Sequence, residues 1–457
     1  MTRLHGLLRV ILAVIASLCI GLALAGGGSI RELHVERLAT LATGLLLIPC
    51  IALPSRLLEH LVPLALFSLI ACVAAEWALR LAVGPEFATN VVLDQKLLHR
   101  LEPGSEKRYR QPAVNGGETV SIEIDSRGYR RSNNEDGVTL SPVLVLGDSF
   151  IEGESTLASL TFAERLSGFL AGRAGDPSIS VLNGGVIGYG PDQVLLRMQD
   201  DISLVRPTAV VVGIFAGNDY GDLMRNRLVS LDADGRLLTH TPMLDPALVQ
   251  KFERGRRRWM IGRLISRIRN APEGVRSDSA TVNAKARELV RTWVSDRREE
   301  ADAAARGIAV VSNLFDDTPD VDMSVDISSG QSERKMALMV AVIDSVNRLA
   351  AAHSTPVLFV LVPSAIDVVD AYDGGQVDQL AYPGYRRDVA TGELAKRLRG
   401  RGIAVVDLFP AFRASTVPLY YVAGDNHWNP SGQELAAQIV SDSLVTRGWH
   451  GPRARSH

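Results

Sequence analysis

Five short, continuously apolar runs follow one another between residues 143 and 408, and they constrain the fold more than any other feature of the chain. The runs are VLVL at 143, ISVLN at 179, AVVVGIF at 209, VLFVLV at 357 and IAVVDL at 403. The stretches between them include patterns typical of helices, such as TFAERLSGFL at 161–170. Strands that are apolar at every position are typical of a parallel sheet covered by helices on both faces. The sequence therefore predicts an α/β fold with a doubly wound, five-stranded parallel sheet.

The interval between the third and fourth runs is too long for a simple connection, so residues 221–331 are predicted to form a helical insert or lid. Within it, RLVSLDADGRLLTH predicts a hairpin that turns at Asp234-Gly235. The basic run KFERGRRRWMIGRLISRIR predicts a lid helix whose apolar stripe packs on the domain; binding to anionic lipid or an acidic polysaccharide is the alternative. FDDTPDVDMSVD lacks the ligand spacing of a calcium loop and predicts an exposed acidic loop.

The first 84 residues contain three further apolar runs, at 10–26, 38–53 and 61–83. Their lengths are near the ~20 residues that a membrane-crossing helix needs, so residues 1–84 are predicted to form about three transmembrane helices. The first run also fits a cleaved signal peptide. Both topologies leave the rest of the chain on the extracytoplasmic (periplasmic or extracellular) side. The expected order is thus a multi-pass region at 1–84, a polar lead-in with β segments at 85–140, an α/β domain at 141–450 and a tail at 451–457.

Net charge and the positions of the cysteines limit the classes of partner and metal site that the sequence allows. The formal net charge of −2 gives no reason to expect nucleic acid. The three cysteines lie in the N-terminal apolar runs, so no cysteine remains for a metal site in the α/β domain. The expected partners are a small-molecule or glycan substrate and, through the N-terminal helices, the lipid bilayer. No metal or organic cofactor is implied.

Four polar clusters follow predicted strands, at the edge of a parallel sheet where ligands collect. Gly147-Asp148-Ser149 follows the first strand and NGGVIGYG (183–190) lies at the end of the second. AGND (216–219) follows the third strand, and GDNHWNPSG (424–432) comes after the fifth. The sequence predicts that all four clusters share one rim.

The residue types on this rim suit acyl transfer. A serine hydroxyl is a weak nucleophile that needs a base, and the base needs an orienting acceptor. We assign these roles to Ser149, His427 and Asp425. The expected oxyanion donors are the backbone N–H of Ser149, the backbone N–H of Gly185 and the side-chain amide of Asn218. Glycine at 185 would let substrate approach the backbone closely. Gly184 and Gly188 are the alternative donors in the same block.

The blocks GDSF, NGGVIGYG, GND and DNHWNPSG resemble, in this order, those of SGNH (GDSL-type) hydrolases over residues 143–448. AEWALR and DSRGYR (125–130) are similar to membrane-anchored bacterial members. Only Asn426 separates Asp425 from His427, where many members have two residues; this spacing resembles alginate-type O-acetyltransferases. The resemblance implies a flavodoxin-like SGNH fold and a serine esterase acting on O-acyl esters of a carbohydrate or envelope glycan through an acyl-serine.

Three other functions remain open. An O-acyltransferase would take acyl groups from a membrane acyl-donor partner and pass them to an extracytoplasmic polysaccharide. A catalytically silent module would use the same cleft to bind a glycan. A metal-dependent phosphoesterase would use Asp148, Asp219 and His427, although Asp148 better fits a structural role on nearby backbone N–H groups. The plain structural alternatives are that Ser149 and Asn218 only close turns and that His427 is a surface histidine.

Overall fold

The computed structural model describes residues 71–80, 89–132, 142–257, 284–294, 319–370, 372–422 and 425–450, together with isolated positions elsewhere. The chain divides into two compact units, residues 1–84 with 259–265 and residues 85–258 with 266–457. Most of the three predicted spans lie outside the described residues. Within the described part of the chain, no helix combines the length and apolar character needed to cross a membrane.

The first unit joins the end of the third apolar run to part of the basic run. Arg80 Nε donates to Glu76 Oε1 at 2.8 Å, as their spacing of four residues on a helix allows. The same carboxylate oxygen accepts the backbone N–H of Met260 at 2.8 Å. Trp259–Ile265 are grouped with the first unit. The apolar stripe of the predicted lid helix lies outside the described residues, so its packing stays a prediction. The rest of that predicted helix beyond Arg257 lies largely outside the described residues.

The second unit is built on a five-stranded parallel sheet. Its order is β11 (Val405–Asp407), β10 (Val357–Val362), β7 (Ala209–Phe215), β5 (Val143–Gly147) and β6 (Val181–Gly185). Read from β6 and numbered along the chain, this is the flavodoxin-like order 2-1-3-4-5. Three strands lie within their apolar runs, while β5 extends one glycine and β6 two glycines beyond theirs. The prediction of a doubly wound five-stranded sheet is confirmed.

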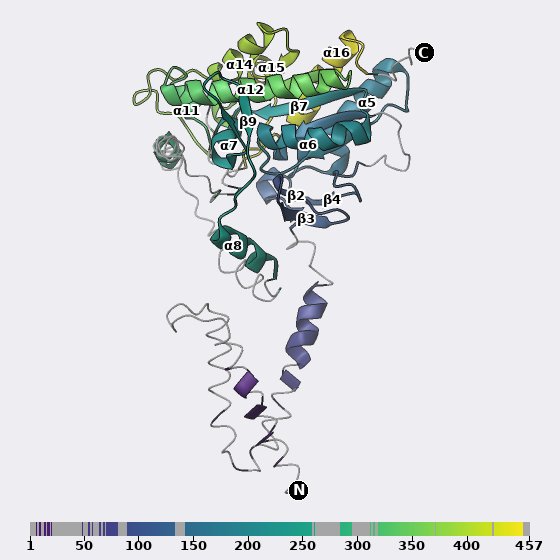
Figure 1. The fold of residues 1–457 in the computed structure, drawn as a ribbon, viewed down its shortest axis with the longest axis vertical. Helices are drawn as coiled ribbons and strands as arrows, with labels where there is room; N and C mark the ends of the chain where they lie inside the picture. The colour runs from purple at the N-terminus through teal and green to yellow at the C-terminus, as the bar shows by residue number, and fades with distance from the viewer. Residues whose placement is uncertain are drawn as a thin grey trace. The chain divides into compact units, whose positions relative to one another are not determined.

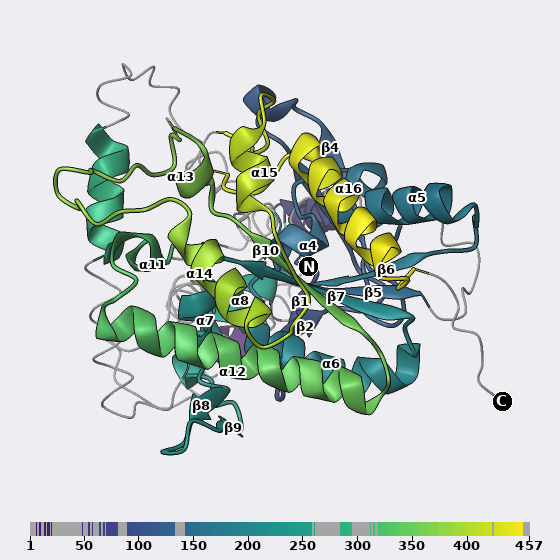
Figure 2. The same ribbon diagram turned by 90° about the horizontal axis from the view of Figure 1, so that it is seen from above.

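Helices cover both faces of this sheet, as Figure 2 shows. On one side lie α6 (Pro191–Val205) and α12 (Gly330–Ala352), and on the other lie α5 (Phe162–Ala174) and α16 (Pro430–Thr446). Alternate residues of β5 enter the two cores: Leu144 and Leu146 pack with the first layer, and Val143 and Val145 pack with the second. Because both faces are buried, every position of the strand is apolar.

The lead-in forms two antiparallel hairpins, visible beside the sheet in Figure 1. They consist of β1 (Val91–Asp94) with β2 (Leu98–Leu101) and β3 (Glu106–Arg110) with β4 (Thr119–Glu123). Leu98 and Ile122 are fully buried in the core on the α6 side. Arg130 then pairs with Asn183 of β6 in an isolated bridge. The lead-in is therefore part of the folded domain, because its apolar side chains help to form the core.

The insert begins with α7 (Asp219–Asn226) and continues into the predicted hairpin, β8 (Val229–Leu231) with β9 (Leu237–Thr239). Gly235 has φ +74° in its turn, a conformation that favours glycine. Helix α8 (Pro246–Arg257) follows, and residues 284–294 are also helical. Most of 258–283 and all of 295–310 lie outside the described residues, so the lid role of the insert stays a prediction.

The prediction of an exposed acidic loop at 315–326 is wrong for two of its aspartates. Lys335 on α12 is only 1% exposed and its Nζ lies 2.8 Å from Asp320 Oδ1 and 2.9 Å from Asp322 Oδ2. Asp320 also accepts the backbone N–H of Gly221, and its own N–H donates to Gly217 O. The buried lysine compensates both carboxylates, and the cluster ties the end of the insert to the turn that carries Asn218.

Candidate active site

Ser149 lies at the carboxyl end of β5, where the strand gives way to the short helix α4 (Ser149–Glu152). Asp148 is the N-cap of this helix, and its Oδ1 accepts the backbone N–H of Phe150 at 3.0 Å. This bond is the structural role that the sequence favoured for Asp148. Ser149, the first residue of the helix, is half-buried.

Asp425, His427 and Ser149 form one continuous hydrogen-bonded chain. His427 Nε2 lies 2.7 Å from Ser149 Oγ, and His427 Nδ1 lies 2.7 Å from Asp425 Oδ1. The same aspartate oxygen accepts the backbone N–H of His427 at 3.0 Å. With Nδ1–H donated to the carboxylate, Nε2 is the ring nitrogen that can accept the serine proton. Residues 278 positions apart are thus brought into direct contact.

The residue after the histidine fixes the loop to the serine helix. Trp428 is 1% exposed, and its Nε1 donates to Phe150 O at 3.0 Å. The Phe150 ring lies 4.9 Å from the His427 ring, centroid to centroid. Asn429 then caps α16, accepting the N–H groups of Ser431 and Gly432, with Pro430 at the first position of the helix as the sequence predicted. The histidine loop is anchored on both sides.

The structure shows where two of the three predicted oxyanion donors, Asn218 and Gly185, lie. Asn218 is buried and precedes α7, in the turn after β7, the strand that pairs with β5. The Gly185 N–H donates to Asn183 Oδ1 at 3.0 Å, so this structure engages it within its own turn.

The structure gives a reason for glycine at 185 that differs from the one expected from the sequence. A Cβ there would lie 2.1 Å from the backbone N of Glu152, well inside contact distance. Glycine at this position is required by the close approach of the α4 backbone.

The sequence reasoning missed Ser155 and Arg130. Ser155 Oγ donates to Asp425 Oδ2 at 2.9 Å, so it bonds the second oxygen of the carboxylate that holds His427. Arg130 is buried and donates to three backbone carbonyls, those of Glu152, Gly153 and Thr156. Arg130 stood out only as part of the DSRGYR resemblance, and no pattern around Ser155 distinguishes it from a loop serine.

Burial and nearby charged groups determine the pKa of the His427 imidazole. Burial alone lowers the pKa of His427, but the hydrogen bond and charge of Asp425, with the charges of Glu154 and Asp148, raise it to about 9. Burial likewise raises the pKa of Asp425, but its bonds to His427 and Ser155 bring it below the ordinary value. At pH 7 the pair is therefore an imidazolium and a carboxylate.

A raised histidine pKa predicts an alkaline pH profile. Because only neutral His427 can take the serine proton, kcat/KM for an acetyl ester should rise roughly tenfold per pH unit from pH 7 and level off above about 9. In Asp425→Asn the largest raising influence on the His427 pKa is removed, while burial and the charges of Glu154 and Asp148 remain. The midpoint should therefore fall, and the plateau should drop by about 10³–10⁴. The exposed Asp442→Asn serves as the control. A wild-type midpoint near 6 would contradict the prediction.

A metal-centred alternative finds little support in the same carboxylates. Asp219 is buried and its Oδ2 accepts the Phe215 N–H at 2.7 Å. Burial and the nearby charge of Asp148 raise the pKa of Asp219 well above its ordinary value. In the described part of the chain, no three His, Cys, Asp or Glu side chains are grouped to hold a metal ion.

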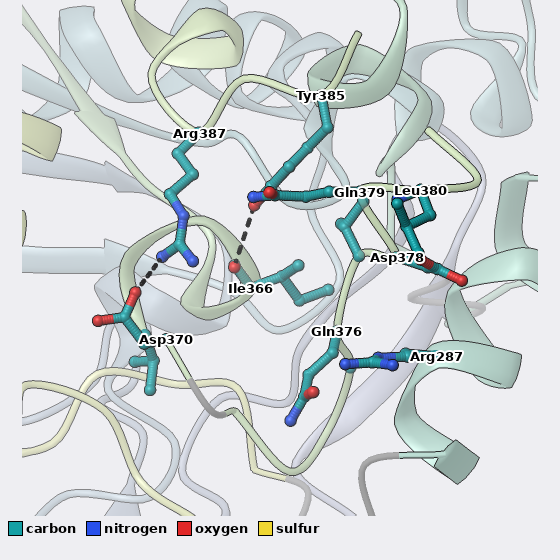
Figure 3. A pocket seen from close by; sticks show the side chains of 12 residues that line it. Arg287, Ile366, Asp370, Gln376, Asp378, Gln379, Leu380, Tyr385 and Arg387 are labelled. Carbon is teal, nitrogen blue, oxygen red and sulfur yellow. Dashed lines mark hydrogen bonds and ion pairs between the residues drawn. The ribbon is translucent and has the colours of Figure 1, made fainter. Parts of the chain in front are cut away.

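Two cavities lie in the region that follows β10. One, of about 370 Å³, is polar, and Figure 3 shows Arg387 paired with Asp370 and Tyr385 bonded to Ile366 O at its wall. The other, of about 440 Å³, shares Val369 and Asp370 with it and is lined by Tyr421, whose N–H donates to His427 O at 3.0 Å. The second cavity therefore borders the histidine loop.

A Ser-His-Asp chain at the carboxyl edge of a flavodoxin-like sheet defines an SGNH-type site. Residues 323–455 match the model of a family described as "SGNH hydrolase-like domain, acetyltransferase AlgX". The match confirms the predicted resemblance to SGNH hydrolases and alginate-type acetyltransferases, and it supports an enzyme that is an ester hydrolase or an O-acyltransferase. No curated protein matches the chain.

Several solved structures are similar to the chain at low identity. A GDSL-like lipase from Bacteroides thetaiotaomicron VPI-5482 is 11% identical and covers 67% of this chain and 89% of its own, with a TM-score of 0.28. A catalytic mutant of an acetylxylan esterase from Geobacillus stearothermophilus is 12% identical, with 68% and 97% coverage and a TM-score of 0.32. A lipase/acylhydrolase from Enterococcus faecalis is 12% identical, with 69% and 99% coverage and a TM-score of 0.30. At such scores the fold assignment rests on the strand order.

Proposed function

We propose that the protein is a serine esterase that cleaves O-acyl esters through an acyl-enzyme on Ser149. The observation that carries the proposal is the unbroken chain of hydrogen bonds from Asp425 through His427 to the Ser149 hydroxyl. Ser149 Oγ attacks the ester carbonyl while His427 Nε2 takes its proton. The imidazolium, held by Asp425, gives that proton to the departing alcohol oxygen as the C–O bond breaks. Water then repeats the sequence in reverse and frees the acid.

The developing oxyanion is stabilised in this proposal by the Ser149 N–H and the side-chain amide of Asn218. Each such donor contributes about 10²–10³ in turnover where it has been removed from related sites. The N–H of Gly185 would act as a third donor only after releasing Asn183 Oδ1.

The experiment that tests the esterase proposal is covalent trapping. A fluorophosphonate should add one adduct per chain, and mass spectrometry of the digested protein should place it on the peptide containing Ser149. Incubation with candidate acetyl esters should give the matching acyl adduct on the same peptide. A silent glycan-binding module would leave Ser149 unlabelled at every pH, and that result would end the proposal.

We propose O-acyl transfer to a glycan as the second function, because the Asp-Asn-His-Trp spacing and the matched family both resemble acetyltransferases. The glycan is then the acceptor, a carbohydrate or envelope polysaccharide, and a membrane acyl-donor partner supplies the acyl group. The purified protein should be given an acetyl ester with an oligosaccharide. Sugar acetylation faster than ester hydrolysis would favour transfer, and unchanged hydrolysis without sugar product would favour the esterase.

We further propose that residues 1–84 anchor the protein in a membrane with the α/β domain on the extracytoplasmic side. Three apolar runs of near-spanning length support this placement. The protein should stay in the membrane pellet after alkaline carbonate extraction, and protease added to intact spheroplasts should degrade the domain. Release into the supernatant, or protection from the protease, would contradict this location.

A further inference from the structure

We propose that Ser155 is a positioning residue for Asp425, and that the β3–β4 hairpin of the lead-in holds Ser155 in place through Gln111. The inference rests on the proposed esterase function and adds two residues to it that act through the triad. Among the described residues, no hydrogen bond joins either of them to Ser149 or His427. Their contribution is to fix the carboxylate on which the imidazole depends.

The first step is that both carboxylate oxygens of Asp425 accept hydrogen bonds. Oδ1 accepts two N–H groups of His427, from the ring and from the backbone, and Oδ2 accepts the Ser155 hydroxyl at 2.9 Å. With Oδ2 held, the carboxylate cannot rotate away from the imidazole without losing a hydrogen bond. Ser155 is 6% exposed, so water does not readily replace its hydroxyl.

The second step is the set of bonds that fixes Ser155. Its carbonyl oxygen accepts the Gln111 Nε2–H at 2.5 Å and the Tyr421 hydroxyl at 2.8 Å. The Gln111 amide also donates to the Tyr421 hydroxyl at 3.0 Å, so the three groups form a closed, buried triangle. Gln111 itself pairs with Glu118 through its backbone at the end of the hairpin. The position of Ser155 thus follows the position of the hairpin.

The third step is that the same hairpin also holds the histidine loop. Asn115, in its turn, exchanges two hydrogen bonds of 3.0 Å with the backbone N–H and carbonyl of Val422. Arg130 donates hydrogen bonds to the carbonyls of Gly153 and Thr156, on either side of Ser155 in its loop. One element of the lead-in therefore contacts both loops that meet at Asp425, and it can set their relative position.

Other titratable groups face the Asp425–His427 pair, and all of them are retained in the variants below. They are Asp148, Glu154, Tyr109, Tyr372 and Tyr421. A change in the pH profile on removing the Ser155 hydroxyl is therefore attributable to that hydroxyl.

The test compares Ser155→Ala, Ser155→Thr and the matched control Ser167→Ala in the full chain. The Ser167 hydroxyl on α5 donates to the carbonyl of Ile179 at 3.2 Å. The rate of fluorophosphonate labelling of Ser149 and its pH dependence are measured for each, with thermal melting to verify folding. Ser155→Ala should label about tenfold more slowly at the plateau. Its midpoint should move to higher pH, because a carboxylate that loses a donor holds the imidazolium proton more firmly. Ser155→Thr should restore both.

Together with Ser155→Ala, the variant Gln111→Ala and the double variant Gln111→Ala/Ser155→Ala form a double-mutant cycle. Because Gln111 acts through Ser155, the double variant should be no slower than Ser155→Ala alone. Additive losses, or a folded Ser155→Ala protein with the wild-type rate and midpoint, would overturn the inference. Failure of the esterase proposal gives a different result, since the wild-type protein would then not label at all.

Discussion

Ser149→Ala is expected to lower kcat/KM for an acetyl ester by about 10⁴ or more and to leave the folded state intact. The change removes only the hydroxyl group, and His427 Nε2 can bond to solvent in its place, because both residues are only partly buried. The covalent step then has no nucleophile, and only binding and oxyanion stabilisation remain. Ester hydrolysis, corrected for the spontaneous rate, measures the loss.

The control for this variant is again Ser167→Ala, which removes a hydroxyl of similar burial that donates to the Ile179 carbonyl. His427→Ala should cost about as much as Ser149→Ala, and the two losses should not add, because the residues act as one unit. Residual hydrolysis within tenfold of wild type in Ser149→Ala would mean that another group attacks the ester.

The sheet was predictable because its signal is local. Each strand is apolar at successive positions, and burial on both faces is the physical reason, as Val143, Leu144 and Val145 illustrate. The triad was predictable for a related reason: parallel strands end at one edge, so Ser149 and His427 could be expected to meet there. Both inferences need only short stretches of sequence and one topological rule.

The supporting contacts were not predictable because they depend on partners far along the chain. The number of aspartates in 315–326 predicts an exposed loop. No pattern in this segment indicates that Lys335 on α12 neutralises the charges of Asp320 and Asp322. Ser155 likewise gains its contact with Asp425 only after the lead-in hairpin and the histidine loop have packed together. Residues 1–84 lie largely outside the described part, so their predicted spans stay predictions.

Gly185 has two possible reasons to be glycine, close approach of a substrate and close packing of α4, and its replacement by alanine separates the two. A Cβ at 185 would lie 2.1 Å from Glu152 N and 2.6 Å from the carbonyl carbon of Ile151. Both are backbone atoms of α4, which cannot rotate aside as a side chain would. Gly185→Ala should therefore displace the helix that begins with Ser149, lowering the free energy of unfolding by about 3 kcal/mol.

Activity should fall with stability in this variant, because a displacement of about 1 Å at reacting groups can cost about 10²-fold in rate. Alanine keeps the backbone N–H, so a role limited to oxyanion donation predicts almost no change in kcat. The matched control is Gly168→Ala on α5, where no heavy atom lies within 4 Å of the added Cβ; it should be neutral or stabilising by about 0.5–1 kcal/mol. Denaturant unfolding and kcat are measured on both. A Gly185→Ala protein as stable and as active as wild type would show that α4 is not packed against β6 as the structure has it.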